Sequence, residues 1–367
     1  MNQTILFNLP LNSTSFGNIS FLIARMLFES EKTDNPIKCN IIPIGPVQLD
    51  TQDKLPPEFN TWLNLKIIKS LENYKKSDPC FRLWHLNGSA ESIGSQQTLL
   101  SFYELDRPTK VELNIASNNN TVFTSKYTNQ VFDNFGVTTK YLAPAFDDYN
   151  FYDTKRKYHG DGRIVFGVFG KAEKRKCHFK IIQSWIKKYG NNVKYALQCS
   201  IWNNFLNPQQ NNALFGQMVN GNKPFNVEFY PWHDKNSKYN DFINSNNIAI
   251  GMSGGESIDL PVLHSVGLGK HAVILNAHAY KDWANNENAI LVNPTGKEPA
   301  ADGMFFREND IYNVGSIFSW NEEEFIFGIE QAVKRFESNP INVNGLKIQQ
   351  EHTKEKFLEN IIKLTTE

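Results

Sequence analysis

The 367-residue sequence contains no run of about 18 apolar residues, the length that a membrane-spanning helix needs. Its opening stretch, MNQTILFNLP, lacks the basic segment and the long apolar core of a secretory signal peptide. We therefore expect no membrane span and a cytoplasmic location.

The sequence also lacks cysteine pairs and net charge. Its four cysteines are scattered without a C-x-x-C pair, so neither a zinc knuckle nor a dithiol motif is predicted. The sequence has 38 Lys and Arg residues and 38 Asp and Glu residues, so its formal net charge is +0. This value argues against a protein that binds a nucleic-acid phosphate backbone nonspecifically through its overall charge. This balance is still compatible with a local basic groove.

The length suggests two domains at roughly 150 residues each. Short apolar runs alternate with amphipathic helical stretches, which predicts parallel sheets covered by helices on both faces. The alternation stops in the polar segment 146–163 and then restarts. We expect an α/β protein with two doubly wound, Rossmann-like domains facing each other across a cleft. The expected boundaries are 1–148 and 149–340, with a C-terminal helix in 341–367 that packs back on the first domain.

The same patterns place the individual elements. Predicted strands cover residues 4–10, 38–45, 80–86, 101–105, 120–125, 140–144, 163–170, 193–202, 225–232, 246–252, 271–277 and 288–294. One predicted helix begins after residue 14, and a further short helix begins near Pro261. The other predicted helices cover residues 59–75, 109–117, 126–135, 177–190, 322–337 and 347–364.

A basic turn, GKAEKRKCHFK at residues 170–180, follows the first strand of the second domain. Lys171, Lys174, Arg175 and Lys176 are close enough to repel one another, and they stand at the unfavourable end of a helix dipole. A bound diphosphate would relieve both costs by accepting from these cations and from free backbone N–H groups. The alternative is a solvated basic face.

A second turn, SGGESIDLPVLHS at residues 253–265, lies between a strand and a helix. Gly254 and Gly255 allow a ligand to approach the backbone, and we expect the Glu256 carboxylate to be free to accept from sugar hydroxyls. Pro261 suits a first helical turn, where the dipole would keep His264 neutral. The alternative is a helix-capping loop with a core histidine.

These two turns carry a family resemblance. SGGESIDLPVLHSVGLGKHAVI resembles the signature of the retaining GT-B glycosyltransferases of the glycogen-synthase and sucrose-synthase kind, in glycosyltransferase family 4. Glu256 matches the first glutamate of that signature and Leu260 begins its Leu-Pro pair, whereas His264 replaces the second glutamate. Lys171 and Lys176 match the spacing of the family's cation pair, with Lys171 in place of the usual arginine. The resemblance implies the GT-B fold.

The N-terminal half resembles the same family more weakly. Residues 101–147 are similar to its run of acidic strand end, helix, strand and glycine-terminated helix. Gly17 matches a glycine near the donor phosphate, and His85 resembles a histidine near the reacting sugar, although it could also be a core histidine. Glu104 could equally cap a helix. The aromatic stretch at residues 229–233 could stack on a nucleobase or belong to the core.

The resemblance implies transfer of a sugar from a nucleotide-diphosphate sugar, with UDP-sugar as our guess, to an acceptor hydroxyl. It implies retention of configuration, and the lack of an Asp-x-Asp motif fits transfer without a metal or other cofactor. Lys171 and Lys176 are expected on the diphosphate, Glu256 on the donor sugar and His85 near the reacting carbon. The other implied donor-binding residues are Gly17, Gly254, Gly255, Ser257, Ile258, Leu260 and His264.

The acceptor is open between a glycan and a hydroxymethylated base in viral duplex DNA. A viral origin would place the protein in the host cytoplasm, and the basic cluster at residues 155–157 would suit a DNA backbone. Two alternatives share the fold: a nucleotide-sugar epimerase, for which the sequence offers no convincing acid–base pair of carboxylates, and a noncatalytic nucleotide-sugar-binding protein. The oligomeric state is also open.

Overall fold

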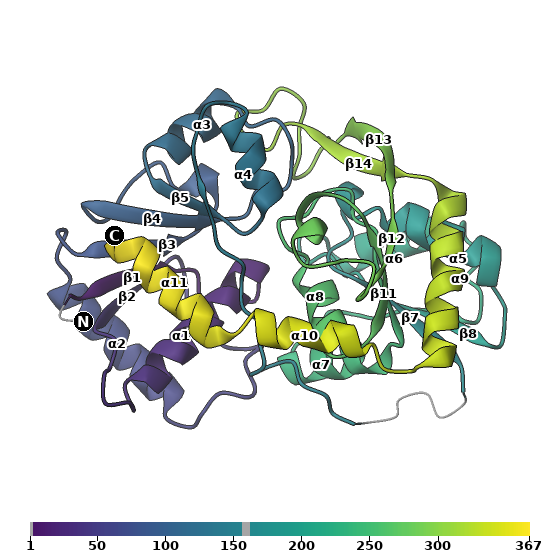
Figure 1. Ribbon diagram of the computed structural model, residues 1–367, viewed down its shortest axis with the longest axis horizontal. Helices are drawn as coiled ribbons and strands as arrows, with labels where there is room; N and C mark the ends of the chain where they lie inside the picture. Colours follow the sequence, from purple (N-terminus) through teal and green to yellow (C-terminus); the bar gives the residue numbers. More distant parts are fainter. Residues whose placement is uncertain (1–2, 156–161) are drawn as a thin grey trace. The chain divides into compact units, whose positions relative to one another are not determined.

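The computed structural model of the protein describes residues 3–155 and 162–367 (Figure 1). The chain divides into two compact units. The first comprises Met1–Tyr103, Pro108–Asn150 and His352–Glu367, and the second comprises Glu104–Arg107 and Phe151–Glu351. The second unit therefore takes in a four-residue segment from the N-terminal half of the chain, and the expected C-terminal segment 341–367 is divided between the units.

The first unit is built on a parallel sheet in the order β2-β1-β3-β4-β5-β6. Its strands are β1 (Ile5–Leu9), β2 (Cys39–Pro43), β3 (Pro79–Leu83), β4 (Gln96–Ser101), β5 (Asn120–Phe123) and β6 (Lys140–Tyr141). Its helices are α1 (Ser15–Ser30), α2 (Phe59–Asn73), α3 (Lys110–Ser117), α4 (Lys126–Asp133) and α11 (Lys354–Thr366). Every residue of β1 and β3 is buried, and the C-terminal α11 packs against β3, β4 and α1.

The second unit is built on a parallel sheet in the order β12-β11-β10-β7-β8-β9. Its strands are β7 (Ile164–Phe169), β8 (Tyr195–Ser200), β9 (Val227–Phe229), β10 (Ile248–Gly251), β11 (His271–Leu275) and β12 (Ile290–Val292). An antiparallel hairpin joins β13 (Pro294–Pro299) to β14 (Ser316–Trp320).

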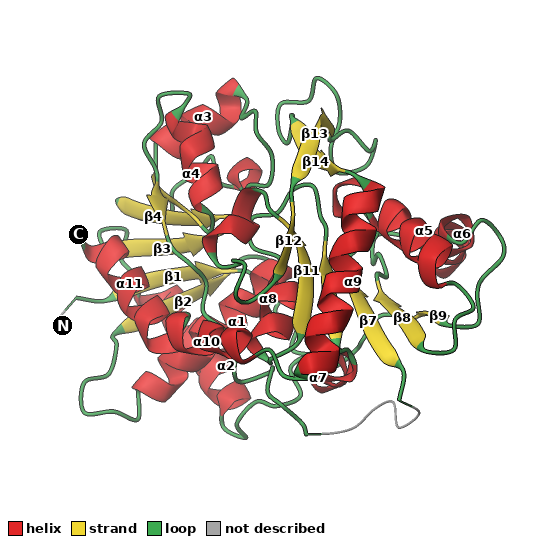
Figure 2. Cartoon of the chain, turned by 45° about the vertical axis from the view of Figure 1, so that its right-hand side comes forward, coloured by secondary structure: helices red, strands yellow, loops and turns green. Residues whose placement is uncertain are grey.

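The helices of the second unit are α5 (His178–Tyr189), α6 (Pro208–Met218), α7 (Asn236–Ser245), α8 (Leu260–Gly267), α9 (Glu322–Ser338) and α10 (Val343–Glu351). They cover both faces of its sheet. In Figure 1, α7 and α8 lie on one side of the sheet and α5 and α9 on the other. Figure 2 shows α9 lying along β11 and β12, which it contacts.

Each sheet changes winding direction beside its first strand. In the first unit β1 lies between β2 and β3, and in the second β7 lies between β8 and β10. The segments that leave the carboxyl ends of the two strands flanking such a switch point diverge, and α/β proteins bind ligands there. The segments concerned follow β1 and β3 in the first unit, and β7 and β10 in the second.

The α/β class and the two doubly wound sheets are confirmed, but some predicted elements are wrong. Residues 101–105 were predicted as a strand, yet only Ser101 belongs to β4, whose ladder begins at the polar Gln96. Residues 347–364 are not one helix. Helix α10 ends at Glu351, and a separate helix, α11, begins after Thr353, whose Oγ1 accepts from the Lys356 N–H at 3.3 Å.

Four further elements, α6, α7, β13 and β14, have no sequence prediction. The helices α6 and α7 are rich in asparagine, which has low helix propensity. The first is fixed by a capping box between Asn207 and Gln210. Strand β13 contains two prolines and a glycine and is mostly exposed, so its sequence lacks the usual strand pattern.

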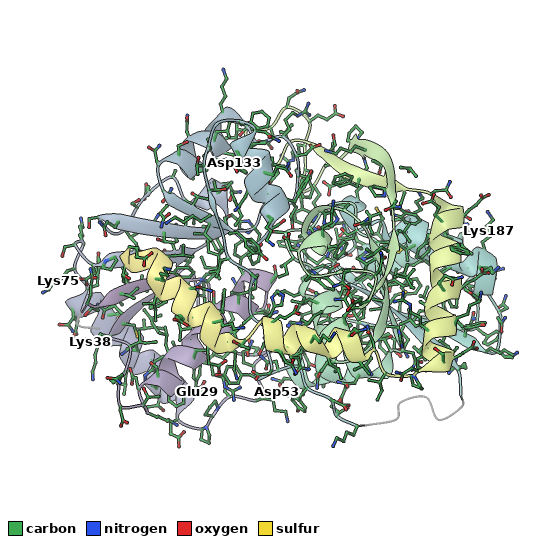
Figure 3. All side chains as sticks on the ribbon, in the orientation of Figure 1. Glu29, Lys38, Asp53, Lys75, Asp133 and Lys187 are labelled. Carbon is green, nitrogen blue, oxygen red and sulfur yellow. The ribbon has the colours of Figure 1, made fainter. Side chains whose placement is uncertain are left out.

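Charged side chains of both signs extend from the surface, including Lys38, Lys75, Asp133 and Lys187 (Figure 3). Among the helices within residues 3–155 and 162–367, none is long and apolar enough to cross a membrane. A group of charged side chains is also buried in the second unit.

Candidate functional site

Two loops meet at the switch point of the second sheet. One follows β7 and contains the basic turn, and the other follows β10 and contains the glycine-rich turn. The Gly254 N–H donates to the Arg175 carbonyl at 2.7 Å, and the Ser253 hydroxyl donates to the same oxygen at 3.0 Å. The parallel pairing of β7 with β10 and these bonds bring together the two turns that the sequence singled out.

The two glycines allow close approach of the chain to itself. A Cβ on Gly254 would lie 2.4 Å from the Phe318 carbonyl oxygen, and one on Gly255 would lie 2.8 Å from the carbonyl oxygen of Glu104. The Phe318 N–H also donates to the Gly254 carbonyl at 2.7 Å. The glycine-rich turn therefore packs closely against the basic loop, strand β14 and the segment 104–107. A role of its glycines in ligand binding stays a prediction.

Arg175 lies at the centre of a buried ion cluster. Its guanidinium contacts Glu104 at 2.9 Å, Glu173 at 3.0 Å and Glu256 at 3.0 Å. It also donates to the carbonyl of Gly255 at 2.8 Å. A buried guanidinium with several anionic partners fixes the relative positions of the segments that carry them. The sequence placed Arg175 in the basic turn but did not single it out.

Lys176 extends the cluster into the glycine-rich turn. Its Nζ lies 2.5 Å from Glu256 Oε1 and 3.7 Å from Asp259 Oδ1. The Tyr280 hydroxyl donates to the other oxygen of Asp259 at 2.5 Å. Asp259 stands at φ 56°, immediately before α8, and neither it nor Tyr280 was predicted as a site residue.

Lys171 is the most accessible cation of the cluster. Its side chain is 39% exposed, and its Nζ lies 2.8 Å from Glu173 Oε1. The same ammonium group stands over the rings of Phe205 and Phe305, at 4.9 and 4.6 Å from their centroids. Lys174, the remaining cation of the turn, instead donates to the carbonyl oxygens of Pro299 and Ala301.

This arrangement corrects two expectations. The basic turn does not depend on an external anion to relieve its repulsion, because Glu104, Glu173, Glu256 and Asp259 already face its cations. Nor is Glu256 a free carboxylate, since it is 4% exposed and ion-paired on both oxygens. Glu173 belongs to the basic turn itself, but the other three carboxylates come from two other segments, so the local sequence of the turn could not show that they face its cations.

Burial and ion pairing divide the carboxyl groups into two kinds. Burial opposes ionisation of Glu256, but Arg175 and Lys176 outweigh it and hold the pKa of Glu256 at about 2. In the same way, the pKa of Glu173 is lowered because Arg175 and Lys171 outweigh its burial. Burial dominates for Glu104 and Asp259, whose pKa values are raised despite the neighbouring cations. The cluster therefore contains firmly ionised carboxylates beside others that hold a proton more readily.

His264 is a buried member of α8. It is the fifth residue of that helix rather than part of its first turn, and its ring stacks on Phe151 with centroids 4.0 Å apart. Burial lowers the pKa of His264 to about 3. The expected neutral imidazole therefore has a different cause, namely desolvation instead of the helix dipole. Ser257, Ile258 and Leu260, which precede it in the chain, are buried as well.

The two remaining predicted residues meet at the switch point of the first sheet. Gly17 is the third residue of α1, where a Cβ would lie 1.9 Å from the Asn12 carbonyl oxygen. His85 follows β3 and is exposed, and its ring centroid lies 4.2 Å from that of Phe16, the neighbour of Gly17. The first unit thus brings these two residues together through Phe16.

The aromatic stretch 229–233 packs largely within the second unit. Phe229 stacks on Phe215 with centroids 4.6 Å apart, and the Tyr230 hydroxyl donates to Glu228 at 2.8 Å. Trp232 is 41% exposed and is the member most available to a planar ligand. Of the basic cluster 155–157, residues 156 and 157 lie outside the described part of the chain.

No group of three or more His, Cys, Asp or Glu side chains in residues 3–155 and 162–367 is arranged to hold a metal ion. The basic turn and the glycine-rich turn instead present cations, a guanidinium fork and an ionised carboxylate. Such groups are suited to a ligand with anionic and hydroxyl functions.

Comparison with known proteins identifies the fold. No protein-family model matches the chain, and no curated protein matches it by sequence. Among solved structures, sucrose-phosphate synthase from Thermosynechococcus elongatus matches with a TM-score of 0.64 at 13% identity, over 99% of this chain and 98% of that chain. A glycosyltransferase from Rickettsia africae matches with a TM-score of 0.66 at 12% identity over 100% of both chains.

A third solved structure contains a ligand. The Anabaena protein HepE, in complex with UDP-glucose, matches with a TM-score of 0.62 at 10% identity over 99% of both chains. These likenesses, together with the two parallel sheets, define the protein as one with the GT-B fold of glycosyltransferases.

Proposed function

We propose that the protein is a glycosyltransferase that moves a sugar from a nucleotide-diphosphate sugar to an acceptor hydroxyl. One observation carries this proposal: the Lys176–Glu256 ion pair joins a basic loop to a glycine-rich turn at the switch point of the second sheet. Ligands bind at such points in α/β proteins, and the likeness to a UDP-glucose complex supports a UDP-sugar as donor.

The cations would stabilise the leaving group. Negative charge develops on the diphosphate as the glycosidic bond breaks, and fixed positive groups lower the free energy of that transition state. Lys171 and Lys176 are assigned to this role as the sequence predicted, and Arg175 joins them because its planar fork suits phosphate oxygens. These three cations form the basis for proposing transfer that needs no metal or other cofactor.

Glu256 is assigned to the donor sugar. Its carboxylate is ionised over the whole physiological pH range, so it can accept hydrogen bonds from sugar hydroxyls once it shares or releases Lys176. Gly17, Gly254, Gly255, Ser257, Ile258, Leu260 and His264 complete the proposed donor-binding set. His85 is proposed near the reacting carbon and retention of configuration as the outcome, both on the strength of the family resemblance.

The proposed acceptor is a glycan hydroxyl, with a hydroxymethylated base in duplex DNA as the second choice. The formal net charge of +0 favours the glycan, since a DNA-binding surface benefits from excess positive charge. DNA binding that weakens steeply with added salt would favour the second choice.

A specific observation supports an epimerase as the second candidate function. Glu104 and Glu256 lie on the same guanidinium, at 2.9 and 3.0 Å. Burial raises the pKa of Glu104, while Arg175 and Lys176 overcome burial to lower that of Glu256 to about 2. A carboxyl group that holds its proton more readily, beside a firmly ionised carboxylate, is the kind of pair that acid–base chemistry on a sugar uses, and the sequence alone did not reveal it.

The test is a panel of nucleotide sugars screened for thermal stabilisation of the protein, because a ligand that binds only the folded state raises its unfolding temperature. The best donor is then incubated alone, with glycan acceptors and with hydroxymethylcytosine DNA. A transferase releases nucleoside diphosphate slowly without acceptor and quickly with the right one. An epimerase interconverts the sugars, and a noncatalytic binding protein does neither. If no nucleotide sugar stabilises the protein, the proposed function is wrong.

A further inference from the structure

Glu173 contacts two of the cations that the proposed function assigns to the diphosphate. Its Oε1 lies 2.8 Å from Lys171 Nζ, and its Oε2 lies 3.0 Å from Arg175 Nε. Its side chain is only 3% exposed. A carboxylate that bridges an ammonium and a guanidinium uses the same donors that a phosphate would use.

The charge of the cluster leaves little attraction for an additional anion. Its three cations, Lys171, Arg175 and Lys176, face four carboxylates. Like charges that share a buried site repel strongly because the surroundings screen them poorly. A diphosphate entering beside all four carboxylates would meet this repulsion, whereas one that replaces a carboxylate would not.

Among the three carboxylates that the two turns carry, Glu173 is the one best placed to leave. Asp259 is held by the Tyr280 hydroxyl, and Glu256 is paired with both Arg175 and Lys176. Glu173 belongs to the basic loop itself and pairs with Lys171, whose side chain is the most exposed of the three cations in the cluster. Displacing it would free the donors of Lys171 and Arg175 for another anion.

The structure also provides room for this movement. Glu173 lines a cavity of about 660 Å³ whose other lining residues include Lys174, Lys180 and Phe305. A carboxylate that turns into this cavity would still lie near the two lysine ammonium groups. Its new position would therefore remain favourable for an ionised group.

We propose that Glu173 is a built-in competitor of the donor diphosphate, which occupies the phosphate donors of Lys171 and Arg175 in the free protein and is displaced from them on donor binding. This inference rests on the proposed function, because it concerns the same donor site. It makes Glu173 an affinity-determining residue, since the free energy of breaking its two ion pairs is subtracted from that of donor binding.

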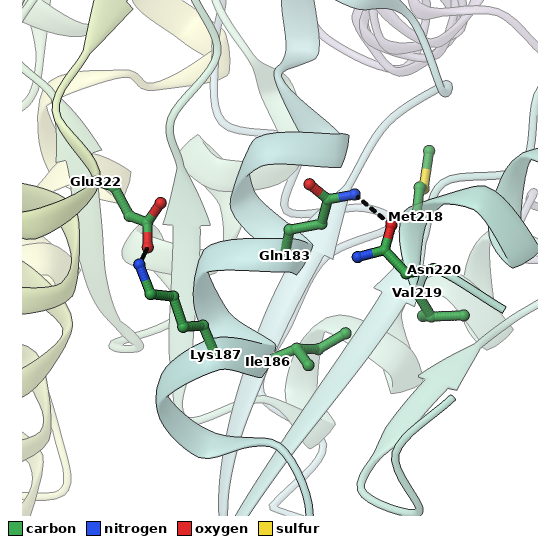
Figure 4. A pocket seen from close by; sticks show the side chains of 7 residues that line it. All are labelled: Gln183, Ile186, Lys187, Met218, Val219, Asn220 and Glu322. Carbon is green, nitrogen blue, oxygen red and sulfur yellow. Dashed lines mark hydrogen bonds and ion pairs between the residues drawn. The ribbon is translucent and has the colours of Figure 1, made fainter. Parts of the chain in front are cut away.

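The test compares wild-type protein with Glu173→Gln and with the control Glu322→Gln. Glu322 pairs with Lys187 at 2.7 Å on the surface, beside a separate cavity (Figure 4), so its substitution removes the same charge without touching the cluster. Calorimetry measures the affinities for inorganic pyrophosphate, UDP and uridine. We expect Glu173→Gln to bind pyrophosphate and UDP about tenfold more tightly than wild type, with unchanged affinity for uridine. Glu322→Gln should match wild type.

The other outcomes separate this inference from the proposed function. If Glu173→Gln binds UDP as wild type does or more weakly, while wild type still binds and turns over a nucleotide sugar, the competitor role is overturned and the function stands. Tighter pyrophosphate binding without turnover of any nucleotide sugar supports the inference and overturns the function. If neither protein binds pyrophosphate or UDP, both are wrong. Should Glu173→Gln fail to fold, Glu173→Asp decides in its place, because its retracted carboxylate should also tighten UDP binding.

Discussion

Lys176 Nζ lies 2.5 Å from Glu256 Oε1, and this ion pair connects the loop after β7 with the loop after β10. Both side chains are buried, so each charge depends on the other and on Arg175 for compensation. The pair therefore links the stability of the second unit to the proposed donor site.

The first prediction concerns this pair. Lys176→Met should destabilise the protein by about 3 kcal/mol, because it leaves Glu256 and Asp259 with one cation fewer in a buried site. It should also reduce turnover about 100-fold if Lys176 stabilises the leaving diphosphate. Urea denaturation and steady-state kinetics measure the two effects.

A double variant tests whether the stability effect arises from the pair. Lys176→Met combined with Glu256→Gln should be less destabilised than the sum of the single variants, since it removes both charges. Lys187→Met, which removes an exposed cation paired with Glu322, should leave the free energy of unfolding nearly unchanged. Simple additivity of the two single variants would contradict the buried ion pair.

The second prediction is that the protein loses stability as the pH falls below about 6.5, the ordinary pKa of histidine. Burial lowers the pKa of His264 to about 3 in the folded protein. The unfolded chain therefore binds a proton between these values that the folded state does not bind. The contribution of His264 to the free energy of unfolding is complete above pH 6.5, and below that pH it falls by about 1.4 kcal/mol per pH unit.

Unfolding free energies of wild type and His264→Phe, measured between pH 7.5 and 5, check this prediction. The phenylalanine keeps the ring stacked on Phe151 but does not titrate, so the variant should lose less stability over this range. Near-UV circular dichroism at pH 7.5 confirms that the variant packs normally. Equal pH slopes for the two proteins would show that His264 does not contribute.

The sequence predicted those parts of the fold and of the site that neighbouring residues in the chain mark, and it missed the contacts between distant residues. Strand β7 is a continuous apolar run and β1 is one interrupted only by Asn8, and both stand beside helical patterns, so the two sheets could be predicted. The two turns could be placed at the ends of strands for the same reason. By contrast, Glu104 and Arg175 are far apart in the sequence, and nothing near either residue indicates their 2.9 Å contact.

Two other features were hidden by composition. Helix α7 contains three asparagines and two serines, and its buried residues include Asn240 and Asn244, which hydrogen-bond to the backbone of Tyr152. Such buried polar contacts give no apolar periodicity from which to predict a helix. Asp259 likewise resembles an ordinary turn residue until Tyr280, brought close by the fold, donates to it.

The third prediction concerns backbone strain at Cys177. This residue has φ 56°, in the left-handed region that glycine adopts without penalty, and it immediately precedes α5. Cys177→Gly should raise the unfolding free energy by about 1 kcal/mol, because it removes the Cβ clash of that conformation. Cys177→Ala keeps the Cβ and should give no such gain, and equal stabilities for the two variants would exclude strain as the cause.

The fourth prediction compares two glycines with opposite surroundings. A Cβ at Gly254 would lie 2.4 Å from the Phe318 carbonyl oxygen, whereas one at Gly216, within α6, would meet no atom within 4 Å. Gly254→Ala should therefore force the glycine-rich turn away from β14 and cost about 2 kcal/mol. Gly216→Ala should instead stabilise the protein by about 1 kcal/mol, because alanine favours the helix.

Denaturant unfolding of both variants measures these changes, and binding of UDP shows whether they reach the proposed donor site. Gly254→Ala should weaken UDP binding, because the Gly254 N–H also anchors the carbonyl of Arg175 at 2.7 Å and so positions the basic loop. Gly216→Ala should leave UDP affinity unchanged. If Gly254→Ala is destabilised but binds UDP normally, the glycine serves the packing of β14 alone, and the diphosphate must be held by groups that do not depend on this turn.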